Sequence, residues 1–147
     1  MVLRVFILGM LAFALAACGD SGPATVGEAK DFASACVKAN DGKRIAIEGY
    51  LRFPDSFSGD SSVVLRLYQA DDYKGKPIGV QTQFGDAANQ IEKVQKKFSD
   101  TDLKVNLASG KVSGFGEKIK VSGKVYYPLV AQEFECALEN PLVEALK

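Results

Sequence analysis

The stretch KRIAIEGYLRF, residues 43–53, alternates between two kinds of side chain over almost its whole length. The odd-numbered positions are Ile45, Ile47, Gly49, Leu51 and Phe53, and the positions between them are Arg44, Ala46, Glu48, Tyr50 and Arg52. Successive side chains of a β-strand point to opposite sides, so a period of two is typical of a strand with one buried face. The stretch therefore predicts a long strand whose odd-numbered residues face a core.

Four further stretches carry the same period and predict four more strands. They are residues 62–70, 78–84, 102–107 and 116–127. Their predicted inward positions include Val63, Leu65 and Leu67; Ile78, Val80, Thr82 and Phe84; and Ile119, Val121, Gly123, Val125 and Tyr127. Polar or glycine-containing segments separate the stretches and predict loops.

Two stretches show the period of a helix instead. Thr25 and Glu28 have the spacing of a capping box, and the apolar residues from Ala29 to Val37 recur at helical intervals. This predicts an N-terminal helix ending near Asn40. The apolar stripe of residues 86–98 predicts a second helix between the third and fourth strands, and a short helix is expected after Pro141.

The predicted fold class is α+β, mostly β: a five-stranded OB-like barrel with an N-terminal helix and a helix between strands 3 and 4. Residues 41–51 (DGKRIAIEGYL) and 116–125 (GEKIKVSGKV) resemble the first and last strands of OB-fold modules similar to the tRNA-anticodon-binding superfamily. Such modules also occur in exported, periplasmic bacterial proteins. The resemblance covers residues 41–127, and a different small α+β sandwich or half-barrel is the alternative.

The N-terminal residues have the layout of a secretory signal. Arg4 precedes an apolar run over residues 5–15, and Asp20 follows too early for a membrane-spanning helix, which needs about 20 apolar residues. The stretch LAAC, residues 15–18, resembles the lipobox of bacterial lipoproteins. The resemblance implies that Cys18 carries a diacylglyceryl group, with palmitate among its fatty acids, and becomes the N-terminus. A plain signal cleaved near Ala17 is the alternative.

This resemblance also predicts the domain organisation and the location. Residues 1–17 are expected to be a cleaved signal peptide, residues 18–27 a tether, and residues 28–147 the OB-like domain. The residue after Cys18 is Gly19, and in the proteobacterial sorting rule an aspartate there retains a lipoprotein at the inner membrane. Glycine favours an outer-membrane anchor facing the periplasm, and the inner membrane and the cell surface remain alternatives.

Cys36 and Cys136 remain once Cys18 is assigned to the lipid. Exported compartments permit disulfides, so these two thiols are predicted to pair. In the chain-entropy model a loop of roughly 100 residues gives about 4 to 5 kcal/mol of stabilisation. A redox-active pair is the alternative, but such pairs usually have the spacing Cys-x-x-Cys.

Composition limits the classes of function. The chain has 18 basic and 18 acidic residues, and this balance argues against a nucleic-acid-binding protein, which needs a basic surface. It contains no histidine, the commonest general base and metal ligand. We therefore expect no enzyme activity, no metal and no cofactor. Weaker candidates are a cation loop over residues 55–62 and the serine–lysine pairs Ser109–Lys111 and Ser122–Lys124, each of which a loop or strand explains.

One basic face stands out in the last predicted strand. Lys118, Lys120, Lys124 and Tyr126 share a side of that strand. OB-folds bind polymers with basic and aromatic side chains, so these residues are the candidate binding site for an anionic glycan or a lipid headgroup. A solvated face, or lysines that discourage edge pairing, is the alternative.

Together these features predict a lipoprotein with a non-catalytic binding or scaffolding role in the cell envelope. Its expected partners are the lipid bilayer, through Cys18, and an anionic glycan, lipid headgroup or protein. Two alternatives stay open: an accessory subunit that docks a protein partner through a sheet edge or the barrel face, and a hydrolase of envelope substrates.

Overall fold

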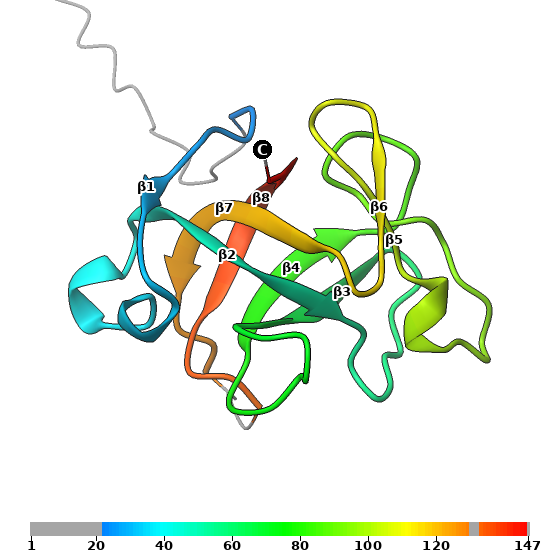
Figure 1. Ribbon diagram of the computed structural model, residues 1–147, viewed down its shortest axis with the longest axis horizontal. Coiled ribbons are helices and arrows are strands. Elements are labelled where there is room, and N and C mark those ends of the chain that lie inside the picture. Colours follow the sequence, from blue (N-terminus) through cyan, green and yellow to red (C-terminus); the bar gives the residue numbers. More distant parts are fainter. Residues whose placement is uncertain (1–21, 130–132, 147) are drawn as a thin grey trace, which may run out of the picture.

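A computed structural model describes residues 22–129 and 133–146, so the predicted signal peptide and Cys18 lie outside the described residues. Five strands form a closed barrel (Figure 1). They are β2 (Arg44–Arg52), β3 (Ser62–Tyr68), β4 (Ile78–Gln83), β7 (Lys118–Tyr126) and β8 (Ala137–Ala145). A mostly β chain with a five-stranded barrel is consistent with the predicted OB-like architecture.

The strands follow the order β2-β3-β4-β8-β7 around the barrel, and β7 pairs with β2 to close it. The pairs β2–β3, β3–β4, β2–β7 and β7–β8 are antiparallel, whereas β4 and β8 run parallel. The spatial order β7-β2-β3-β4 is that of a Greek key. The strands β2, β3 and β4 lie side by side in chain order, and β7, the next barrel strand, returns to lie beside β2. A parallel neighbour needs a long crossover, and the chain between β4 and β8 supplies it.

β2 pairs with a different neighbouring strand along each part of its length. Its residues from Arg44 to Tyr50 pair with β7, and those from Tyr50 to Arg52 pair with β3. The odd-numbered residues of β2 point inward and are buried, as the alternation in residues 43–53 predicts. Val63, Leu65 and Leu67 of β3 are buried in the same way. The barrel interior is one continuous apolar core. Its largest fully buried members are Phe53, Ile45, Ile47, Leu65, Leu67, Ile91, Leu103, Leu138, Val80, Val121, Val125 and Val143.

Glycine at position 123 lets two strands approach closely. A Cβ at Gly123 would lie 2.7 Å from the Cβ of Leu138 on β8. The register between β7 and β8 also shifts between Ser122 and Lys124, as at a β-bulge. Bulges and glycines bend strands, and a barrel of only five strands needs such bends to close.

The predicted N-terminal helix is wrong. The segment contains the short strand β1 (Glu28–Ala29), parallel to β2, and two 3-10 turns, η1 (Phe32–Ser34) and η2 (Lys38–Asn40). Asn40 donates hydrogen bonds from Nδ2 to the carbonyl oxygens of Ser34 and Ala35, at 2.9 and 3.1 Å. These bonds satisfy carbonyls that a helix would have used. Ala35 is buried, as the apolar spacing predicts, but it lies between two 3-10 turns and not in a helix.

The second predicted helix, over residues 86–98, is also wrong. Ile91 forms bridges with Phe84 and Val105, so this part of the chain runs extended between its neighbours. The N–H of Ile91 donates to the carbonyl of Gln83 at 3.0 Å, and Asn106 N–H donates to the carbonyl of Gln90 at 2.8 Å. Backbone pairing with these neighbours replaces the internal hydrogen bonds of a helix, a case of tertiary structure overriding local propensity.

The strand that completes the barrel also differs from the prediction. β5 (Lys104–Asn106) forms a separate hairpin with β6 (Val112–Gly114), preceded by a 3-10 turn, η3 (Asp100–Asp102). The fifth barrel strand is β8, in the tail where a short helix was expected after Pro141. None of the helices in the described part of the chain has the length and apolar character needed to span a membrane.

Candidate functional site

The pairing between β4 and β8, which we call the β4–β8 seam, covers only part of the length of these strands. The two strands pair only at Gly79–Ala137 and Val80–Leu138. Beyond Leu138 the backbone of Asn140 takes a positive φ of 48°, which an L-residue adopts rarely. Pro141 follows and has no N–H to donate to a neighbouring strand. These two residues end the pairing with β4, while β8 continues along β7 to Ala145.

A groove of about 640 Å³ lies where the seam opens. Three parts of the chain line it: β4 with the start of β3, the loop after β4, and the irregular stretch of β8 around Asn140. The N-terminal residues 22–24 form a further wall. The lining residues are Gly22, Pro23, Ala24, Ser61, Ser62, Gln81, Thr82, Gln83, Ala88, Asn89, Gln90, Glu139, Asn140 and Pro141.

The chemistry of the groove is that of amides and hydroxyls. Five of its lining side chains are carboxamides, three are hydroxyls, and Glu139 is the one charged group among them. Lys124 lies 3.6 Å from the Glu139 carboxylate and compensates its charge. The groove is therefore polar and close to neutral.

Several of these groups are held in place by hydrogen bonds. Thr82 donates from Oγ1 to the carbonyl of Asn89 at 3.0 Å, and the side-chain oxygen of Asn89 accepts the N–H of Val143 at 2.8 Å. Asn89 has a positive φ of 65°, so its turn brings both bonds together. Side chains fixed in this way lose little entropy when a ligand arrives, which favours binding.

Tyr126, a predicted binding residue, lies at the edge of this groove. Its hydroxyl donates to Oε1 of Gln81 at 3.2 Å. Burial raises the pKa of Tyr126 above its usual value, and the carboxylate of Glu139 raises it further. The phenol is therefore neutral at physiological pH and keeps its proton for hydrogen bonding.

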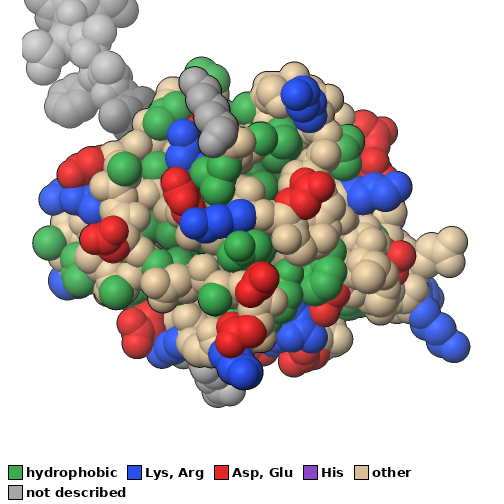
Figure 2. Space-filling view, in the orientation of Figure 1, with side chains coloured by type: hydrophobic (Ala, Val, Ile, Leu, Met, Phe, Trp, Pro, Cys, Tyr) green, Lys and Arg blue, Asp and Glu red, His purple; other side chains and the backbone are tan. Residues whose placement is uncertain are grey.

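The three predicted binding lysines lie on the outer face of β7, and each has a carboxylate neighbour. Lys118 contacts Glu48 on β2 at 3.1 Å, Lys120 contacts Glu144 on β8 at 3.1 Å, and Lys124 contacts Glu139. Figure 2 shows basic and acidic side chains interspersed over one face of the molecule. The face thus holds ordered lysines with little net positive charge, and its role as an anion site stays a prediction.

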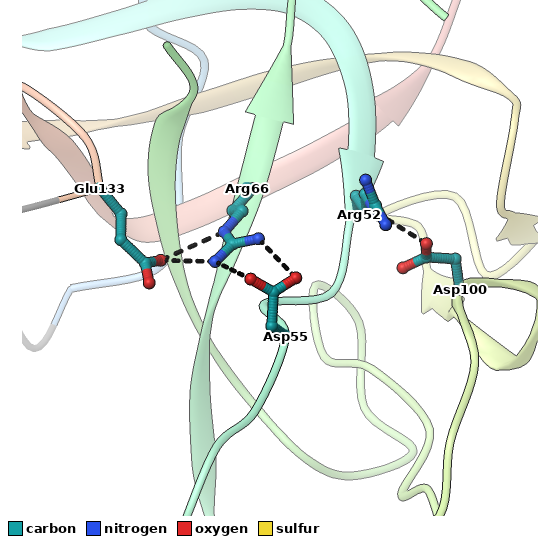
Figure 3. Close-up of polar contacts among 5 residues, drawn as sticks. All are labelled: Arg52, Asp55, Arg66, Asp100 and Glu133. Atoms are coloured by element: carbon teal, nitrogen blue, oxygen red, sulfur yellow. Dashed lines mark hydrogen bonds and ion pairs between the residues drawn. The ribbon is translucent and has the colours of Figure 1, made fainter. Parts of the chain in front are cut away.

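Arg66 joins two loops on the outside of β3 (Figure 3). Its guanidinium contacts Asp55, in the loop after β2, at 3.1 and 3.2 Å, and Glu133, in the segment before β8, at 2.8 and 3.1 Å. The hydrogen bonds that Arg66 donates to these carboxylates raise its pKa, and those to Asp55 contribute most. Next to it, Arg52 donates from Nε to Asp100 at 2.7 Å. We call Arg66, Asp55 and Glu133 the loop latch.

The structure also places the cysteines, the candidate cation loop and one of the serine–lysine pairs. Cys36 and Cys136 form a disulfide, with Cα atoms 5.4 Å apart, as predicted. Asp55, from the candidate cation loop, accepts hydrogen bonds from Arg66. No cluster of three or more potential metal-ligating Cys, Asp or Glu residues occurs in the ranges that the structure describes. Ser122 is fully buried between Ala46 and Leu142, out of reach of a substrate.

The groove was not found from the sequence, because its residues come from five separate segments and carry no shared motif. One local signal was present. Asn140-Pro141 interrupts a strand-like tail, and such a pair ends strand pairing on one side. The same pair is also compatible with the start of a helix, which is the expectation that the structure corrects.

Comparison with known proteins adds no relative: the chain matches no protein-family model, no curated protein and no solved structure.

Proposed function

We propose that this chain is a non-catalytic binding protein of the cell envelope, anchored to the outer membrane through a lipid on Cys18, and that its groove holds a neutral, hydroxyl-rich ligand such as a glycan. The single observation that carries the ligand class is the lining of the groove: five carboxamides and three hydroxyls with one, compensated, charge.

Carboxamides suit sugars for a chemical reason. Each carboxamide offers a donor and an acceptor side by side, and each sugar hydroxyl can both donate and accept. A groove without unpaired charge also avoids the desolvation cost that burying a charge against a neutral ligand would carry. The disulfide supports an exported location, since such bonds persist in oxidising compartments.

The test is a titration of the ¹⁵N-labelled mature protein with a neutral N-acetylhexosamine oligosaccharide, and separately with a sulfated oligosaccharide of the same length. We expect the neutral sugar to shift the side-chain amide signals of Gln81, Gln83 and Asn140. The double variant Gln81→Leu/Gln83→Leu is expected to bind roughly thirtyfold more weakly, since each of the two lost hydrogen bonds contributes about 1 kcal/mol.

Gln69→Leu is the matched control, because Gln69 is exposed just beyond the end of β3 that lies away from the groove. It should bind like the wild type. Shifts confined to Lys118 and Lys120 with the sulfated sugar would instead support the anion site on β7. An absence of shifts with either sugar at millimolar concentration would refute a glycan ligand.

Docking of a protein partner is the second candidate, and one feature favours it. β1 forms an outer edge of the six-stranded sheet and pairs with β2 alone among the described strands. It spans only Glu28–Ala29, however, and short edge strands are poor templates for an added strand. The groove therefore ranks first.

A further inference from the structure

The N-terminal wall of the groove is fixed to the barrel as far as its first described residue. Asn140 donates from Nδ2 to the carbonyl of Gly22 at 3.2 Å. Arg44 donates from Nε to the carbonyl of Thr25 at 2.6 Å, and the N–H of Lys30 donates to the carbonyl of Ala46 at 3.0 Å. The same Arg44 also donates to the carbonyl of Asn140 at 2.8 Å, which ties this wall to β8.

Only residues 19–21 separate Gly22 from Cys18. An extended chain spans at most about 3.6 Å per residue, so the Cα atom of Cys18 lies within about 14 Å of that of Gly22. This limit holds for every conformation of the intervening residues. A lipid on Cys18 would therefore hold the groove wall, rather than some other part of the barrel, next to the bilayer.

We infer that the groove opens at the membrane surface and that the hydroxyl-rich group it takes is carried on that same membrane. The inference rests on the proposed function, including the lipid on Cys18. A glycolipid headgroup and a free sugar chain offer the same hydroxyls, and the geometry favours the membrane-bound source. A ligand confined to the same surface has an effective concentration in the millimolar range, which lets a groove of modest affinity be occupied.

The far end of β3 supplies an internal comparison. Ser62 lines the groove at the start of β3, and Gln69 follows Tyr68 at its other end. A strand rises about 3.3 Å per residue, so the two positions are roughly 23 Å apart. If the groove faces the membrane, position 69 lies much farther from it.

The experiment uses the lipidated protein in vesicles of phosphatidylethanolamine and phosphatidylglycerol that also contain a neutral glycolipid with an oligosaccharide headgroup. A photoreactive residue replaces Ala88, which is exposed and lines the groove, or Gln69 as the control. We expect cross-linking to the glycolipid from position 88 at least five times that from position 69, and loss of this cross-linking when free oligosaccharide competes.

Tether length provides a second, independent variable. A flexible Gly/Ser stretch of about 20 residues between Ser21 and Gly22 adds roughly 25 Å of reach and should lower cross-linking from position 88 severalfold. The same stretch added after Lys147 is the matched control and should change nothing. Equal cross-linking from positions 88 and 69, or no effect of the longer tether, would overturn the inference.

Binding of free oligosaccharide to the same sample distinguishes a failure of the membrane-facing groove from a failure of the proposed function. Normal binding of the free sugar without cross-linking to the glycolipid would refute the membrane-facing groove and leave the proposed function intact. Failure of the free sugar to bind would refute the proposed function itself.

Discussion

Arg66 and Glu133, 67 positions apart in the chain, are joined by two hydrogen bonds of 3.1 and 2.8 Å. The same guanidinium holds Asp55, so one nearly buried side chain on β3 connects the loop after β2 with the segment before β8 (Figure 3). The two carboxylates are largely in water, whereas the Arg66 side chain is only 10% exposed. This difference in burial decides what each substitution does.

Removing the arginine should cost less than removing its partners. In Arg66→Met the apolar stem is retained and two exposed carboxylates return to water, so we expect a change of no more than about 1 kcal/mol in the free energy of unfolding. Asp55→Asn/Glu133→Gln leaves a nearly buried guanidinium without a charged partner and should destabilise more. Urea unfolding of both variants measures the order, and a larger loss in Arg66→Met would contradict it.

The latch should also respond to acid. The hydrogen bond and charge of Arg66 hold the pKa of Asp55 below its ordinary value of 3.8. A folded-state pKa below the unfolded one means that this contribution to stability is present above about pH 4 and is lost as the pH falls through the folded-state pKa. A ¹³C titration of the Asp55 carboxyl measures the pKa, and Arg66→Met should return it towards 3.8. A titration that is the same in both proteins would refute the coupling.

The disulfide should be the largest single contribution to stability. Cys36 and Cys136 close a loop with a sequence separation of 100 residues. The chain-entropy model gives about 4 to 5 kcal/mol for a loop of this size. We expect Cys36→Ser/Cys136→Ser to lower the free energy of unfolding by about that amount in urea, with the barrel still formed by circular dichroism. Addition of a reductant to the double variant should have no further effect.

Gly123 should be intolerant of a side chain. Because an added Cβ would lie 2.7 Å from the Cβ of Leu138, Gly123→Ala forces β7 and β8 apart. Overpacking of this kind costs about 1 to 3 kcal/mol. Gly114→Ala on β6 is the matched control, since the nearest atom to its Cβ would be 4.0 Å away. Similar losses in both variants would show that general strand propensity, rather than the close approach, is responsible.

The lysines of β7 should bind polyanions only after their carboxylate neighbours are neutralised. Glu48, Glu139 and Glu144 lie within 3.1 to 3.6 Å of Lys118, Lys124 and Lys120. We expect the wild type to elute from immobilised heparin at low salt. The variant Glu48→Gln/Glu139→Gln/Glu144→Gln should elute at clearly higher salt, since it keeps the lysines without compensation. Strong retention of the wild type would instead favour the anionic ligand predicted from the sequence.

The strand pattern of this chain was readable because burial on one face has a strict period of two. The inward residues of β2 and β3, from Ile45 to Leu67, follow that period and lie in the core as predicted. The pairing of Cys36 with Cys136 was predictable from the hypothesis that the chain is exported and lipidated at Cys18, since two thiols are then left and can pair in one way.

The two helices predicted from apolar spacing are absent, because residues with that spacing can also be buried by 3-10 turns and extended chain. Ile91 is buried as a helix would bury it, but its backbone pairs with β4 and β5. The groove and the loop latch were hidden for a different reason. Gln83 and Asn140, or Arg66 and Glu133, meet only after the barrel has closed, and no local spacing connects them.

The disulfide would have a mechanical consequence if Cys18 carries the proposed lipid. A pull on that lipid would enter the described domain at Gly22 and reach β1, which pairs with β2 through only two residues. Peeling can advance no farther than Cys36, because the covalent bond there transfers the load to Cys136 at the start of β8. β2, the strand shared by both sides of the barrel, is thereby shielded from unzipping, and the domain can resist tension that would open an uncrosslinked barrel from its N-terminus.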